Sequence, residues 1–416
     1  MKSQDIRTNK FDNGLTLLSQ VITWINSVSI CVAVKAGPRY ESEESSGLAH
    51  FLEHMLFEGT KSYPSAKELA QVIESVGGKS SAWTDKEYVA YNIKVPKEHL
   101  DKGLSYLHEI LFNPAFDDES VAREKTIILE EMQRKEDNPE VETVDLFMEY
   151  CWGKEQALGR STLGERSTIE NITPKRLKDY LKDFYYSSNM TISVVGNFKE
   201  RELKRAIQKY FGHASIKKRV EMEKNTFFYP KLRTKKIKAD TKQSQLILGT
   251  VTNIHYHHKD RFVMRVIADI LSFGVSSRLF NKLVYQLGIS YSPGVFNWTF
   301  KDTGMLIIYG GFSPNNIKLA IDVIKDELQK LREENVNSKE LSTAKIIDIA
   351  NMYYSFETPD SISWWYATMW ATERRILSVG EIKREIEKVT PQDIKRIANK
   401  YLNEKNFITL IRGELQ

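Results

Sequence analysis

The fold is indicated by a segment that occurs twice, TPKRLKDYLKDFYYSSNMTISVVG at Thr173–Gly196 and TPQDIKRIANKYLNEKNFITLIRG at Thr390–Gly413. Each copy begins with Thr-Pro, continues as an amphipathic helix pattern, turns at polar residues and ends in a strand-like run closed by glycine. Equivalent positions lie 217 residues apart, which is 390 minus 173. A pattern repeated at a fixed offset predicts two structural units of the same topology.

Other segments of the two halves agree in order. The strand-like run SVSICVAVKAG precedes a helix pattern at 47–57, and KQSQLILGTVTN precedes the helix pattern DRFVMRVIADILSF. Later in each half comes a pair of strands. We therefore expect an α+β fold of two tandem homologous domains, each an antiparallel-rich sheet with helices packed on it. The expected ranges are 1–212 for the N-terminal domain, 213–232 for a linker and 233–416 for the C-terminal domain.

The composition is that of a folded protein with room for more than one core. Of the 416 residues 41% are hydrophobic and 28% charged, and the formal net charge is +5. The sequence has no basic stripe interleaved with aromatic residues, so it does not predict nucleic-acid binding. The two cysteines, Cys31 and Cys151, have neither metal-binding spacing nor a disulfide framework. No signal-type segment and no run of about 18 apolar residues is present, so we expect a cytoplasmic protein without a membrane span.

A metal-binding motif lies in the segment SSGLAHFLEHMLFEGT. Its helical pattern places His50 and His54 one turn apart on one face, with Glu53 beside them, and Ser45 or Ser46 is expected to cap the helix. Two such imidazoles bind one Zn²⁺ and leave a carboxylate next to the metal. The alternative interpretation is an ordinary capped amphipathic helix that carries two polar histidines.

A catalytic zinc takes a third protein ligand, and the helix pattern DDESVAREKTIILEEMQRKED offers several. Glu124 and Glu131 are seven residues apart and share one face, whereas Glu130 points about 100° away from Glu131. On the residues alone, all three glutamates remain candidates.

These segments resemble the M16, or pitrilysin-like, metallopeptidases, whose zinc motif is the inverted His-x-x-Glu-His. The resemblance extends over essentially the whole chain, including FDNGLTLL, GLAHFLEHMLFEGT, VGGKSSAWTDKEY, AREKTIILEEM and SSRLFNKLVYQLGISY. It is strongest to the short chains of the family, such as mitochondrial processing peptidase subunits and their bacterial relatives. The resemblance implies that one chain forms half of a clamshell and that two chains enclose a chamber.

The resemblance also implies roles for the candidate residues. The family's third ligand follows the second histidine by 76 or 77 positions, and Glu131 lies 77 positions after His54. The resemblance is taken to imply that one zinc ion per chain is held by His50, His54 and Glu131. Glu124 is implied to orient a ligand histidine, and Glu53 to act as general base on zinc-bound water. The implied activity is that of a zinc-dependent endopeptidase acting on short or unfolded peptides. The alternative is a non-catalytic scaffold or partner subunit of the same fold.

Peptide substrates of the family pair with a strand edge, and the matching residues here are Ser81, Ala82, Trp83 and Thr84. The family usually has asparagine where this chain has Ser81. For Trp83 itself the favoured interpretation is an ordinary packed strand residue, because strand aromatics usually pack.

A substrate-contacting Arg and Tyr, seven residues apart, are common in the family's C-terminal domain. Here the tyrosine is Tyr291, but the arginine position is Val284. The resemblance therefore implies a dimer. The favoured form is a heterodimer in which a zinc-less homologous partner supplies the missing arginine, and a homodimer is the alternative.

The cluster of His255, His257 and His258 is predicted to be a strand end and loop, with a second metal site as the alternative.

Overall fold

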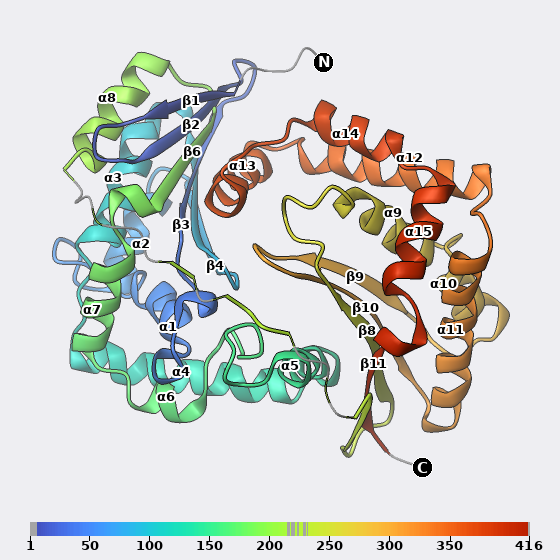
Figure 1. Ribbon diagram of the computed structural model, residues 1–416. Coiled ribbons are helices and arrows are strands. Elements are labelled where there is room, and N and C mark those ends of the chain that lie inside the picture. The colour runs from blue at the N-terminus through green and yellow to red at the C-terminus, as the bar shows by residue number, and fades with distance from the viewer. Residues whose placement is uncertain are drawn as a thin grey trace. The chain divides into compact units, whose positions relative to one another are not determined.

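The computed structural model describes residues 6–213, 217, 221–222, 224–227, 230 and 232–414. The chain forms two units, each with its own sheet (Figure 1). The first unit comprises Met1–Met132, Arg160–Glu223 and Ser355–Ile376, and the remainder of the chain forms the second. None of the helices in the described part of the chain is both long and apolar enough to cross a bilayer.

The first unit contains a six-stranded sheet in which only β2 and β6 run parallel. In spatial order its strands are β1 (Arg7–Lys10), β2 (Thr16–Val21), β6 (Met190–Gly196), β3 (Ser27–Val34), β5 (Val89–Pro96) and β4 (Lys79–Thr84). Its helices are α1 (Leu48–Met55), α2 (Ala66–Glu74), α3 (Leu100–Phe112), most of α4 (Asp118–Glu136), α6 (Arg166–Glu170), α7 (Pro174–Phe184), α8 (Glu200–Phe211) and α13 (Pro359–Glu373).

Both faces of the first sheet are covered, because every residue of β6 is buried. One face packs on the main core, to which α1, α3 and α8 contribute Phe51, Leu107 and Phe211. The other face packs against α13, which lies along β3 and β6 (Figure 1). Polar contacts fix α13 there, including Tyr366 Oη donating to Gln20 Oε1 at 2.7 Å.

The second unit contains a five-stranded sheet in which only β7 and β11 run parallel. In spatial order its strands are β7 (Thr234–Lys238), β11 (Ile408–Gly413), β8 (Ser244–Thr252), β10 (Gly304–Phe312) and β9 (Gly294–Thr299). Its helices are α5 (Pro139–Trp152), α9 (Arg261–Ser272), α10 (Arg278–Phe280), the π-helix η5 (Asn281–Gln286), α11 (Ile317–Glu333), α12 (Ser338–Ser355), α14 (Val379–Lys388) and α15 (Pro391–Tyr401).

The expected two-domain α+β architecture is confirmed, because the order of elements repeats. The helices α7 and α15 occupy the same place in the two units, and each is followed by the strand that pairs with the middle of its sheet. Thr173 and Thr390 both cap their helices, accepting hydrogen bonds from the backbone N–H groups of Arg176 and Asp393. The repeated segment therefore forms the same helix and strand twice.

The units differ from the contiguous ranges 1–212 and 233–416, because each sheet is covered on one face by a helix from the other half of the chain. Helix α5 packs on β8 and β11, where Phe147 lies in one core with Ile247 and Leu410. Helix α13 makes the reciprocal packing on the first sheet. A repeat in the sequence predicts that such helices exist but not which sheet they cover. The expected linker at 213–232 lies partly outside the described residues.

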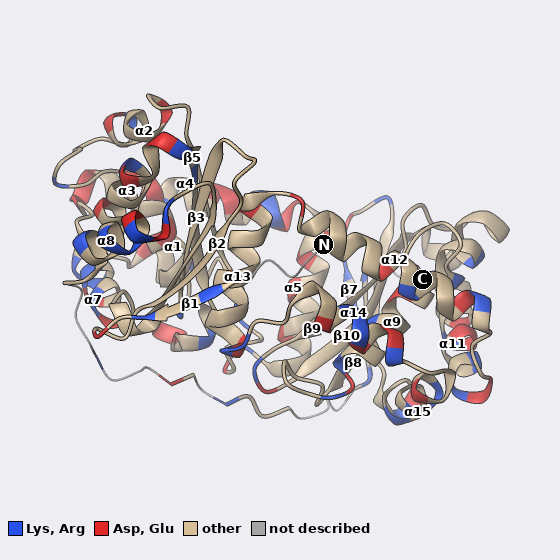
Figure 2. Cartoon of the chain, turned by 90° about the horizontal axis from the view of Figure 1, so that it is seen from above, with Lys and Arg blue, Asp and Glu red and all other residues tan. Residues whose placement is uncertain are grey.

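Charge is mixed over the surface of both units. Figure 2 shows Lys and Arg alternating with Asp and Glu on the exposed helices, including α7, α8, α11 and α15.

Candidate zinc site

The histidines of the candidate site are carried by a short helix that is buried on its other faces. In α1, Phe51, Leu52 and Met55 are fully buried in the core of the first unit. His50 and His54 follow one another by one turn, and their ring centroids are 4.6 Å apart. The packing of the apolar face therefore fixes the direction of the histidine face.

The third member comes from α4, where Glu131 lies next to both histidines. Its Oε2 is 3.8 Å from His50 Nε2 and 3.8 Å from His54 Nε2. Among the described residues, His50, His54 and Glu131 are the one group of three potential ligands whose donor atoms all lie within 4.8 Å of one another. Glu130 is exposed, so the structure brings Glu131, and not Glu130, to the histidines.

This donor set fits zinc. Two imidazole nitrogens and one carboxylate oxygen are a common catalytic ligand set, which leaves a fourth position for water. Donor atoms about 2.1 Å from a tetrahedral zinc lie about 3.4 Å from one another, so the observed separations require only small side-chain adjustments.

Glu124 lies behind His54 and is almost completely buried, at 3% exposure. Its Oε1 is 2.7 Å from His54 Nδ1. When Nδ1 carries the proton that is donated to this carboxylate, Nε2 presents its lone pair toward the other two ligands. Burial lowers the pKa of His54, but the hydrogen bond to Glu124 and the charges of Glu124, Glu53 and Glu131 together outweigh burial, so the pKa is raised overall. The predicted orienting role of Glu124 is thus consistent with its position.

Glu53 lies on the same helix and is largely buried. Burial raises the pKa of its carboxyl group, and this effect outweighs the hydrogen bond from Thr84 and the charge of His54, which lower it. Thr84 Oγ1 donates to Glu53 Oε2 at 2.5 Å. The result is a carboxylate of increased basicity, held in one orientation beside the candidate ligands.

The sequence predicts Thr84 only as part of the substrate strand and does not predict its hydrogen bond to Glu53. The signal for it is the alternation of side chains along a strand. Ala82 packs against the core and Thr84 is buried on the same side, whereas Trp83 is 58% exposed on the other. The interpretation of Trp83 as a packed strand residue is therefore wrong.

Within the described residues, strand β4 is the outer strand of its sheet and pairs only with β5. An outer strand of this kind can pair with an additional strand. A pocket of about 350 Å³ lies between this strand and the candidate zinc site. It is lined by Glu53, His54, Phe57, Glu58, Ser80, Ser81, Ala82 and Glu124.

The remaining predicted residues lie in the second unit. Tyr291 is 86% exposed, and Val284 belongs to the π-helix η5. Their roles toward substrate stay predictions.

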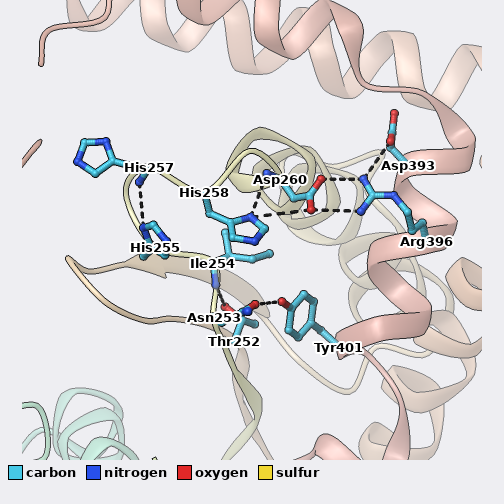
Figure 3. A network of polar contacts seen from close by, with 10 residues as sticks. All are labelled: Thr252, Asn253, Ile254, His255, His257, His258, Asp260, Asp393, Arg396 and Tyr401. Atoms are coloured by element: carbon cyan, nitrogen blue, oxygen red, sulfur yellow. Dashed lines mark hydrogen bonds and ion pairs between the residues drawn. The ribbon is translucent and has the colours of Figure 1, made fainter. Parts of the chain in front are cut away.

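The histidine cluster occupies the loop between β8 and α9, as expected (Figure 3). His255 Nδ1 accepts from the backbone N–H of His257 at 3.2 Å, and His258 Nδ1 accepts from that of Asp260 at 3.1 Å. The Asp260 carboxylate is bonded to Arg396. These contacts describe a turn held by side chains, which fits the loop interpretation.

The sequence matches two family models. Residues 18–166 match the model described as insulinase, peptidase family M16, and residues 171–347 match the peptidase M16 inactive domain. Among similar proteins is the uncharacterized zinc protease YmxG of Bacillus subtilis, 31% identical over 96% of each chain. Another is the probable mitochondrial-processing peptidase subunit beta of Schizosaccharomyces pombe, 28% identical over 98% of this chain and 91% of that protein.

Two solved structures have the same fold. A protease from Helicobacter pylori superposes with a TM-score of 0.90 over 99% of this chain and 100% of the other, at 21% identity. A peptidase M16 inactive domain from Pseudomonas fluorescens superposes with a TM-score of 0.91 over 99% of both chains, at 18% identity. At these identities the likeness establishes the fold.

Proposed function

Because this chain belongs to the M16 family of peptidases, related to zinc proteases, we propose that it is a zinc-dependent endopeptidase that cleaves short or unfolded peptides. The observation that carries the proposal is the convergence of His50, His54 and Glu131, with the partly buried Glu53 beside them. A scaffold subunit would have no reason to keep all four groups in this arrangement.

His50, His54 and Glu131 would hold one zinc ion. When bound, zinc supplies Lewis acidity, which lowers the pKa of water and polarises a carbonyl group. Glu53 takes the proton from the attacking water and later delivers it to the leaving amine. Thr84 keeps Glu53 in one orientation by donating to Oε2, and so leaves the other oxygen for the proton.

The proposed substrate binds as an extra strand on β4. Its backbone would pair with the outer edge of Ser81–Thr84, and alternate side chains would enter the pocket next to His54. A folded protein cannot add a strand in this way, which restricts substrates to extended chains. Ser81 in place of the family's asparagine leaves this backbone pairing intact.

The proposed assembly is a dimer, with a zinc-less homologous chain as the favoured partner. Two observations support it: the beta subunits of mitochondrial-processing peptidase are among the relatives, and Val284 stands at the arginine position. The proposed location is the cytoplasm.

The test is digestion of a mixture of unstructured peptides by the purified chain, with products read by mass spectrometry. A chelator-treated sample and Glu53→Gln serve as controls. We expect cleavage that the chelator abolishes and that Glu53→Gln lowers by roughly 10²–10⁴-fold without loss of zinc. Stoichiometric zinc without cleavage would indicate that the arginine-bearing partner is required. Neither zinc nor cleavage would overturn the proposal and favour the scaffold subunit.

A further inference from the structure

The helix that carries the candidate ligands has no cap of its own. Its N-cap residue is Gly47, which has φ 91° and no side chain to accept a hydrogen bond. A Cβ at this position would lie 2.8 Å from the backbone oxygen of Leu163, so the position requires glycine. The expectation that Ser45 or Ser46 caps the helix is wrong, because Ser45 Oγ bonds Ser42 and the buried Ser46 Oγ has no partner.

The cap comes instead from Glu41, six residues upstream of Gly47. Glu41 Oε2 accepts from the backbone N–H of Gly47 at 2.9 Å, and Oε1 accepts from that of Ala49 at 2.6 Å. Both carboxylate oxygens are thus used at the positive end of the helix, where a negative charge is favoured. Ala49 directly precedes His50, so the capped turn is the one from which the first ligand projects.

Burying this carboxylate is costly: burial raises the pKa of Glu41 to about 7, and the backbone hydrogen bonds and the charges of Arg160 and Lys86 oppose this only in part. Glu41 is only 4% exposed, and an isolated charge in such a place costs several kcal/mol. The buried Arg160 lies beside it and donates from Nη1 to the Glu41 backbone oxygen at 2.6 Å. Lys86 Nζ in turn bonds the backbone oxygen of Arg160.

The same segment is attached to the turn that follows β4. Arg39 forms a fully buried ion pair with Glu87 at 2.6 Å, and its backbone N–H donates to Lys86 at 2.9 Å. This turn begins directly after Thr84, the residue that bonds Glu53. The segment 37–41 therefore connects the start of α1 to the strand that orients the proposed general base.

We propose that Glu41 is a positioning residue for the metal site. This proposal rests on the proposed function. Its carboxylate holds the first turn of α1 in place and thereby sets the directions of His50, Glu53 and His54. It contacts neither metal nor substrate and acts through the helix backbone.

The test compares Glu41→Gln with Glu44→Gln, an exposed glutamate of the same stretch that takes no part in the cap. Glutamine keeps the size of the side chain but has one acceptor oxygen, and its NH₂ group faces a backbone N–H. We expect Glu41→Gln to weaken zinc binding by about 10–100-fold, the size of effect seen when groups that hold metal ligands in place are changed. It should also lower kcat with little change in KM, and speed amide hydrogen exchange at Ala49. Glu44→Gln should match the unmodified chain in all three measurements.

Wild-type zinc affinity and kcat in a folded Glu41→Gln would overturn the proposal. If that variant does not fold, amide exchange is measured in the metal-free wild-type chain. Protected amides at Gly47 and Ala49 support the cap, and exchange as fast as in an unstructured segment overturns it. A wild-type chain that binds no zinc would refute the proposed function, whereas exchange at Ala49 would still report whether Glu41 holds the helix.

Discussion

The two units place equivalent helix pairs next to equivalent sheets, but different groups join the helices of each pair. In the first unit, α1 presents His50 and His54, one turn apart, toward Glu131 of α4. In the second unit, α9 presents Arg265 and Asp269, also one turn apart, and Arg265 bonds Asp348 of α12. Glu131 and Asp348 are separated by 217 residues, the same offset as the repeated segment.

The difference lies in where the positive charge comes from. The group in the first unit consists of two imidazoles and a carboxylate. A bound metal cation would supply the positive charge that joins these three side chains. In the second unit the cation is the guanidinium of Arg265, paired with an Asp348 that is 3% exposed. Under the proposed function, one helix pair takes up an ion, whereas the other pair is joined by an ion pair between its own side chains.

The largest effect on zinc content is expected when the acidic residue of each helix pair is replaced by its amide. Glu131→Gln should abolish stoichiometric zinc and peptide cleavage, because two histidines alone hold zinc weakly. Asp348→Asn should leave the zinc content at one per chain and lower only stability. Metal analysis after dialysis, with thermal unfolding of both variants, measures this. Loss of zinc in Asp348→Asn would contradict the proposed difference between the two helix pairs.

The next effect concerns the residue behind the ligand. Glu124→Gln should weaken zinc binding by about 10–100-fold, because it removes the carboxylate that orients His54. Glu130→Gln is the matched control on the same helix, since Glu130 is exposed. Competition with a chromogenic chelator gives both affinities. Equal affinities for the two variants would show that the contact with His54 is dispensable.

A pH effect is expected in the second unit. Burial raises the pKa of Asp269 to about 7, the charge of Asp348 adds to this, and Arg265 opposes it. The folded state thus binds a proton more tightly than the unfolded chain does, whose carboxyl has an ordinary pKa near 4. Stability contributed by this group is complete below about pH 4 and is lost as the pH rises to about 7.

Asp269→Asn removes this titration, so the free energy of unfolding should depend less on pH between 4 and 7 than in the wild-type chain. Urea unfolding across this range, followed by tryptophan fluorescence of the metal-free protein, measures the change in slope. An unchanged slope would mean that Asp269 does not hold the proton.

The smallest effect is expected at the strand edge. Trp83→Ala removes a side chain that is 58% exposed, so unfolding should change by less than about 0.5 kcal/mol. If peptides add to β4, KM should rise several-fold while kcat changes little, since the side chain next to the added strand is lost. An unchanged KM would argue against this edge as the binding strand.

Much of this comparison is predictable from the sequence. The repeat at a spacing of 217 residues predicts two units of the same topology, because each copy carries its own helix and strand signals. The spacing of His50 and His54 places them on one helix face, because 3.6 residues make one turn. These are properties of local periodicity, which neighbouring residues determine by themselves.

Only the tertiary structure decided the contacts between distant segments. It placed Glu131 against the histidines and left Glu130 exposed. It also brought Thr84 within hydrogen-bond distance of Glu53, and it capped the helix with Glu41 where a serine was expected. It also packed α5 and α13 on sheets from the opposite halves of the chain. Such choices depend on which buried polar groups and apolar faces meet in space. Local sequence patterns specify that these groups need partners but not where the partners come from.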